Sequence, residues 1–162
     1  MDDFFYDPQE SLGFMTITVN RLMSACLRRK MREDGIDLTA EQWGILVLLW
    51  NHAGSTQEEL AHVGCVDKSS MSRVLSLMEA KGLIIRRTDP ADGRRKIIRP
   101  SEKAMQLRRG ALAVVNHVMD NALRNISQQD RDLCLTVLNT VRENLRHGEC
   151  GLPSGPPSDP PA

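Results

Sequence analysis

Apolar residues near the start of the chain recur in alternating steps of three and four. This spacing predicts an amphipathic helix that begins near Pro8, because proline is tolerated in a first turn, and that ends at Gly35. The apolar stripe comprises Leu12, Met15, Val19, Leu22 and Cys26, widened by Phe14, Ile17, Met23 and Leu27. So broad a stripe indicates contacts on two sides of the helix.

Shorter helices are predicted in the middle of the chain, each with a recognisable start. Thr39 with Gln42, and Thr56 with Glu59, have the spacing of capping boxes. The first box predicts a nearly all-apolar, buried helix over 40–52. The second box predicts a short helix whose buried face is formed by Leu60 and Val63 and whose end is turned by Gly64.

A further helix, capped by Asp67 and running to about Lys81, has two contrasting faces. Met71, Val74, Leu75 and Met78 form an inward stripe. The outward residues are polar: Lys68, Ser69, Ser70, Ser72, Arg73 and Ser76. Gly82 ends this helix, and two strands follow over 83–88 and 96–99. The loop between them carries Pro90 and Gly93, which are turn residues.

Two long amphipathic helices are predicted after the strands, capped by Ser101 and Ser127. Leu112, Val115, Met119, Ala122 and Leu123 share a face of the first, and Leu133, Val137, Val141 and Leu145 repeat every four residues in the second. The first helix and these last two helices have more apolar surface than is needed to cover the small central part of the chain, which predicts a homodimer. We therefore expect a frayed start (1–9), dimerisation helices (10–36 and 101–147), a central module (37–100) and a disordered tail (148–162).

This order of elements predicts a mainly α-helical winged helix-turn-helix fold with about six helices and a small β-hairpin wing. The 162 residues are enough for one ordinary domain, and the formal net charge is zero. The charge is unevenly distributed, however: residues 86–99 contain six basic and two acidic side chains. A basic patch on a neutral protein is typical of contact with phosphate.

The outward residues of the helix at 68–81 predict a double-stranded-DNA contact. Small hydroxyl side chains allow close approach to a groove, and arginine pairs with guanine edges. A serine-rich solvent-facing helix is the alternative, but serine forms helices less readily than glutamate or lysine. The hairpin loop suits the minor groove. The expected DNA-binding residues are Lys68, Ser69, Ser70, Ser72, Arg73, Arg86, Arg94, Arg95 and Lys96.

Other functional classes are less consistent with the sequence. No phosphate-binding glycine loop and no nucleophile–base motif is present, so we predict neither an enzyme nor a cofactor. His62 and Cys65 have ligand-like spacing without a second pair, so no metal site is expected. The alternative function is a winged helix that binds proteins, for which an apolar or acidic outer helix face would be expected. A signal peptide and a membrane span are not expected, and four scattered cysteines indicate the cytoplasm.

Over about residues 10–147 the chain resembles the MarR (multiple antibiotic resistance regulator) family of bacterial transcription factors. The resemblance depends on the order and spacing of four motifs. These are Leu38-Thr-x-x-Gln42, Asp67-Lys-Ser-Ser-x-Ser-Arg73, Leu77-x-x-x-Lys81-Gly-Leu83 and Arg87-x-Asp-Pro-x-Asp-x-Arg94. It implies a homodimeric regulator, usually a repressor acting at near-palindromic operators, that small molecules or oxidants release from DNA.

The resemblance also implies residue roles. Asp92 is expected to brace the wing while Arg94 enters the minor groove. A ligand cleft is expected to involve Met15, Trp43 and Leu46. Cys26 is a candidate redox sensor, although it also continues the apolar stripe, where a buried and inert cysteine is more common. The chain departs from the family pattern at Gly93, which removes a charge from the wing, and at Pro100, which removes a backbone donor.

Overall fold

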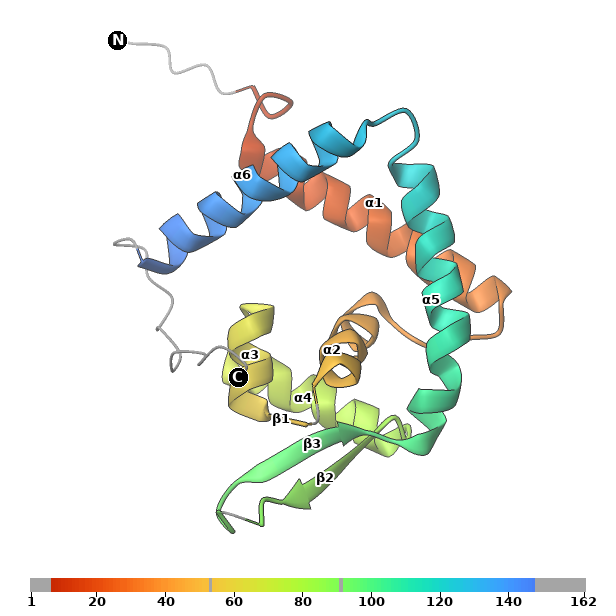
Figure 1. Cartoon of the computed structure of the whole chain (residues 1–162), viewed down its shortest axis with the longest axis vertical. Coiled ribbons are helices and arrows are strands. Elements are labelled where there is room, and N and C mark those ends of the chain that lie inside the picture. Colours follow the sequence, from red (N-terminus) through yellow and green to blue (C-terminus); the bar gives the residue numbers. More distant parts are fainter. Residues whose placement is uncertain (1–6, 53, 91, 148–162) are drawn as a thin grey trace. The chain divides into compact units, whose positions relative to one another are not determined.

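The computed structural model describes residues 7–52, 54–90 and 92–147 (Figure 1). Most of the predicted frayed start and the whole predicted tail lie outside these residues. The helices are α1 (Leu12–Glu33), α2 (Ala40–Asn51), α3 (Gln57–Gly64), α4 (Lys68–Ala80), α5 (Glu102–Ala122) and α6 (Gln128–His147). The strands are β1 (Ser55–Thr56), β2 (Ile84–Thr88) and β3 (Lys96–Pro100). The predicted mainly α-helical winged fold is confirmed. No helix in the described part of the chain is both long and apolar enough to cross a membrane.

The chain divides into two compact units. One comprises residues 1–43 with 107–124, and the other comprises 44–106 with 125–162. The second unit therefore includes α6, which we had grouped with α1 and α5. Arg146 of α6 donates a hydrogen bond to the carbonyl of His62 at 3.2 Å, at the end of α3. The dimerisation role of α1, α5 and α6 remains a prediction.

Side chains of the predicted types begin the helices. Thr39 and Gln42 bond reciprocally at 3.2 and 3.1 Å, which confirms the first capping box. The start predicted for α1 is wrong, however, because residues 8–10 form turns and the helix begins at Leu12. The Ser11 hydroxyl accepts from the Phe14 amide at 3.3 Å, and so satisfies a donor that a helix leaves unpaired.

A three-stranded antiparallel sheet follows the order β1–β3–β2. The hairpin register pairs Ile84 with Pro100 and Thr88 with Lys96. Pro100 thus lies at the strand end, where a missing donor matters little, and the next amide, that of Ser101, donates to the Leu83 carbonyl at 3.0 Å.

Strand β1 was missed by the sequence reasoning, because two residues carry no readable alternation. It pairs with β3 through Ser55 opposite Ile98. Gly54 precedes it with φ +149°, and a Cβ there would lie 2.5 Å from Cγ2 of Ile97. Only glycine combines that backbone angle with so close an approach to a neighbouring strand.

The winged module, residues 55–100, has its own buried core. Its buried side chains come from α3, α4, the bend before β2 and the sheet: Leu60, Ala61, Met71, Leu75, Met78, Leu83, Ile84 and Ile98. Two predictions about α3 are wrong. Val63 is 54% exposed, and its place in the core is taken by Ala61. The turn after the helix is made by Cys65 in the left-handed region (φ 50°), whereas Gly64 still belongs to the helix.

Helices α1 and α6 each leave several large apolar side chains exposed, whereas α4 exposes Leu77 but buries Met71, Leu75 and Met78. On α1 the exposed apolar side chains are Leu12, Phe14, Met15, Ile17, Val19 and Leu22. On α6 they are Leu133, Leu135, Val137, Leu138 and Leu145. Among the residues that the structure describes, each of these two helices therefore has exposed apolar side chains.

Candidate nucleic-acid interface

Helix α4 has a buried apolar face and an exposed polar face, as its sequence predicted. Met71, Leu75 and Met78 are at most 3% exposed. On the opposite face Lys68, Ser69, Arg73 and Ser76 are exposed, while Ser70 and Ser72 are partly buried. The helix thus carries short hydroxyl side chains and two cations on the face opposite its buried side chains.

The start of α4 is stabilised by Asp67. Its Oδ1 accepts from the Ser69 hydroxyl at 2.5 Å and from the amides of Ser69 and Ser70 at 3.0 and 2.9 Å. These hydrogen bonds, led by the one from the Ser69 hydroxyl, hold the pKa of Asp67 well below its ordinary value. The negative charge of the carboxylate also lies at the positive end of the helix dipole, where it is favourable. The first turn of α4 is therefore ordered before any ligand arrives.

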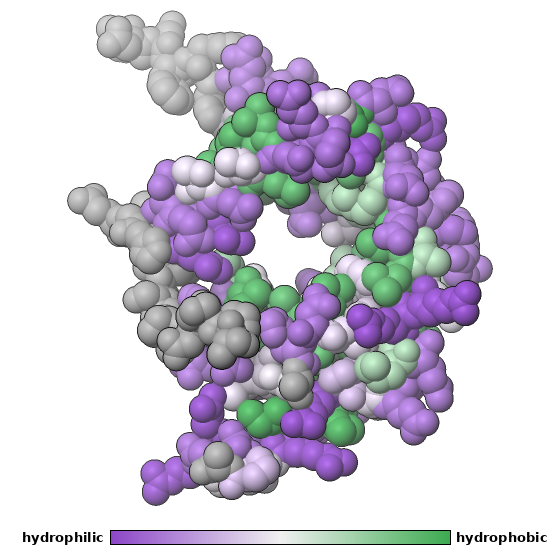
Figure 2. All heavy atoms as spheres, in the orientation of Figure 1, coloured by the Kyte–Doolittle hydropathy of each residue, from purple (hydrophilic) through white to green (hydrophobic). Residues whose placement is uncertain are grey.

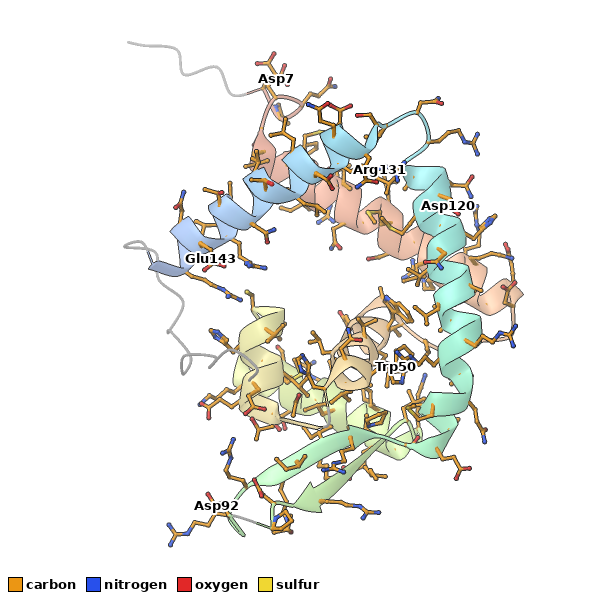
Figure 3. All side chains as sticks on the ribbon, in the orientation of Figure 1. Asp7, Trp50, Asp92, Asp120, Arg131 and Glu143 are labelled. Carbon is orange, nitrogen blue, oxygen red and sulfur yellow. The ribbon has the colours of Figure 1, made fainter. Side chains whose placement is uncertain are left out.

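The hairpin tip is a tight turn closed by Asp92, which Figure 3 shows at the end of the wing. Its Oδ1 accepts from the Arg94 amide at 3.0 Å, and its carbonyl accepts from the Arg95 amide at 2.9 Å. This is the geometry that the predicted bracing role requires. Arg94, Arg95 and Lys96 are all exposed, and hydrophilic residues dominate the surface at this end of the hairpin (Figure 2).

Several of the predicted DNA-binding cations are already paired within the module. Lys68 Nζ lies 2.7 Å from Glu58 Oε1, and Arg95 Nη2 lies 3.2 Å from Glu59 Oε1. Sequence reasoning assigned Glu59 only to the capping box and did not single out Glu58. The paired residues are 10 and 36 positions apart in the sequence, so no local sequence pattern predicts these two ion pairs.

A family model matches the part of the chain that contains this surface. The MarR family model aligns with residues 38–96, which span α2, α3, α4 and the hairpin. This match covers the central part of the chain only. The resemblance seen in the sequence motifs is thereby confirmed.

Proteins similar to this chain include two from Bacillus subtilis (strain 168). The HTH-type transcriptional regulator YdgJ is 27% identical over 65% of this chain and 64% of its own length. The HTH-type transcriptional regulator YybA is 26% identical over 68% of this chain and 73% of its own length. The chain thus spans just under two thirds of the first of these relatives.

Solved structures share the fold. CouR from Rhodococcus jostii RHA1, bound to p-coumaroyl-CoA, is 25% identical with a TM-score of 0.68, over 88% of this chain and 94% of that one. The transcriptional repressor CouR bound to a 23-mer DNA duplex is 23% identical with a TM-score of 0.73, over 83% and 94% of the two chains.

Arg86 occupies a different environment from the exposed arginines of the hairpin. Its Nε lies 3.2 Å from Glu79 Oε2 on α4, and its Nη2 lies 3.5 Å from the Ser76 hydroxyl. The side chain is only 26% exposed. Arg86 therefore connects the wing to α4, and a contact with DNA would require it to leave these partners.

The residues expected to line a ligand cleft or to sense oxidants lie in varied surroundings. Met15 is exposed, Trp43 is partly buried, and Leu46 is completely buried. Cys26 is a free thiol on the exposed surface of α1, so the expected burial of its side chain is not seen in the single chain. A cleft that uses Leu46 would have to open around it.

Proposed function

We propose that this chain is a sequence-specific, double-stranded-DNA-binding transcriptional regulator of the MarR family. The observation that carries the proposal is the polar outer face of α4, bearing Lys68, Ser69 and Arg73 beside an arginine-tipped hairpin. A second helix of this kind reads base edges in the major groove, and a basic hairpin reaches phosphates or the minor groove.

The similarity to named regulators supports the proposal. YdgJ and YybA are named HTH-type transcriptional regulators, and CouR is a transcriptional repressor with a solved structure bound to a 23-mer DNA duplex. A protein-binding winged helix would present an apolar or acidic outer face on its second helix. The outer face of α4 instead carries Lys68, Arg73 and several serines.

The regulator would act as a homodimer. The exposed apolar side chains of α1 and α6 need a partner, and a second copy of the chain supplies a matching surface. A two-fold symmetric dimer presents two copies of α4, so the operator is expected to be near-palindromic, with half-sites about one helical turn, or 10 base pairs, apart.

Repression relieved by a signal is the proposed mode of control. CouR binds p-coumaroyl-CoA, which supports a small-molecule effector, with Met15, Trp43 and Leu46 as the expected lining. An oxidative signal through Cys26 is the second candidate, favoured by the exposure of its thiol. If release of DNA by peroxide survives Cys26→Ser, Cys26 is not the sensor.

The proposal is tested by binding of the purified protein to duplex DNA at two salt concentrations. Phosphate contacts make affinity fall steeply between about 50 and 200 mM salt. Arg94→Ala is expected to weaken operator binding by roughly 1–3 kcal/mol, whereas Arg29→Ala, a matched charge loss on α1, should change it little. An affinity for DNA that does not change with salt concentration would favour the protein-binding alternative. So would equal losses of DNA affinity in Arg94→Ala and Arg29→Ala.

A further inference from the structure

Two carboxylates on the first turn of α3 face two of the predicted DNA-binding cations. Glu58 pairs with Lys68, the first residue of α4, and Glu59 pairs with Arg95 at the base of the hairpin loop. One short helix therefore restrains cations on both of the elements proposed to contact DNA. A module that binds a polyanion gains nothing in affinity from acidic residues at this position, so the arrangement calls for an explanation.

Glu59 has a clear structural role. Its Oε2 accepts from the Thr56 amide at 2.8 Å, while the Thr56 hydroxyl accepts from the Glu59 amide at 3.2 Å. This capping box stabilises the start of α3. The pairing with Arg95 uses the other carboxylate oxygen, Oε1, so it is additional to the capping role.

Glu58 has no such role in the cap, yet it is held beside Lys68. The neighbouring Gln57 donates from Nε2 to the carbonyl of Lys68 at 3.2 Å, which joins the start of α3 to the start of α4. The hydrogen bond from Lys68, and then its positive charge, lower the pKa of Glu58, and the charge of Arg95 adds to this effect. The carboxylate is therefore ionised at neutral pH.

An open depression of about 510 Å³ adjoins both pairs. It is lined by Thr56, Gln57, Glu58, Arg95 and Lys96. A DNA phosphate that approached these cations would come close to the carboxylate of Glu58. Exposed ion pairs contribute little to stability, and the side chains of Lys68 and Glu58 are 75% and 59% exposed, so this pair can be exchanged readily.

We propose that Glu58 is a specificity-determining residue that competes with DNA phosphates for Lys68. The inference rests on the proposed DNA-binding function. Non-specific binding depends almost entirely on phosphate contacts, so an internal competitor weakens it directly. Operator binding also includes base contacts from α4, which can compensate for the lost pair. The carboxylate thus keeps non-specific binding weak, while the base contacts still hold the operator complex, at the cost of absolute affinity.

The test is the affinity of the full chain for a random-sequence duplex, measured by fluorescence anisotropy at low salt. Glu58→Gln should bind roughly three- to tenfold tighter than the unmodified chain, since a freed Lys68 charge about 4 Å from a phosphate in water changes affinity by that order. The gain should shrink at about 200 mM salt. Glu59→Gln, which retains the capping box, should shift affinity in the same direction through Arg95.

Two further variants assign the effect to Lys68. Lys68→Met should weaken binding. In the Lys68→Met background, Glu58→Gln should have no effect, because the lysine for which Glu58 and the phosphates compete is then absent. Glu102→Gln removes another exposed carboxylate, on the first turn of α5, and should leave affinity within about twofold of the unmodified chain. Thermal unfolding of each variant confirms that it is folded.

The outcomes separate the inference from the proposed function. If the unmodified chain binds no duplex even at low salt, the proposed function fails. If it binds in a salt-dependent manner but Glu58→Gln binds no more tightly, the inference is overturned and the function stands. A gain that persists without Lys68 also overturns it, because Glu58 would then act by repelling DNA directly.

Discussion

Helices α4 and α1 are both amphipathic, yet their apolar side chains lie in opposite environments. In α4, Leu75 and Met78 are completely buried within the winged module. In α1, Leu12 and Leu22 are 49% and 62% exposed, and α6 is similar, with Leu133 62% exposed. The module covers its own core, whereas the terminal helices carry apolar surface that a second copy of the chain is proposed to cover. One sequence pattern therefore serves folding in one region, and we propose that it serves association in the other.

The largest expected effect tests burial within the module. Leu75→Ala should lower the free energy of unfolding by about 3–4 kcal/mol, because it leaves a cavity in a closed core. Leu77→Ala, on the exposed face of the same helix, should change it by less than about 0.5 kcal/mol. Urea unfolding at a single protein concentration measures both. Equal losses would mean that both faces of α4 are covered in the assembled protein.

A smaller effect is expected on α1, and it should appear in association. Leu22→Glu places a charge on the exposed apolar face and should weaken dimerisation at least tenfold, about 1.4 kcal/mol, with the helix content unchanged. Asn20→Glu adds the same charge about 200° away around the helix and should have less effect. Sedimentation at several concentrations measures both. An unchanged dimer would assign the apolar face of α1 to another purpose.

The smallest expected effect is the pH dependence that Asp67 gives to the module. Its pKa is lowered in the folded chain, so its contribution to stability is complete above the unfolded value of 3.8 and is lost as the pH falls towards the folded value. Asp67→Asn keeps a capping oxygen but does not titrate. The unmodified chain should therefore lose more stability than Asp67→Asn between about pH 5 and pH 2. Parallel losses in urea unfolding would show that Asp67 titrates normally.

The starts of the internal helices could be predicted from the sequence, because each depends on partners within three residues. Thr56 with Glu59, and Asp67 with Ser70, are visible as spacing alone. The buried stripe of α4 could also be read, since every third or fourth residue of a helix shares a face. Two predicted helix boundaries were wrong because the surrounding residues determine them. Ser11 begins α1 in place of Pro8, and Cys65, not Gly64, makes the left-handed turn after α3.

By itself, the sequence determined the order of the elements, the caps of the internal helices, and the apolar and polar faces of α4. These features depend on residues within one or two helical turns of each other, where backbone geometry sets the distance. Only the tertiary structure decided that β1 joins the sheet beside β3, that Arg86 is held by Glu79, and that Glu58 and Glu59 engage Lys68 and Arg95. Those contacts form where the chain returns on itself, and no local spacing encodes which distant charge will lie opposite.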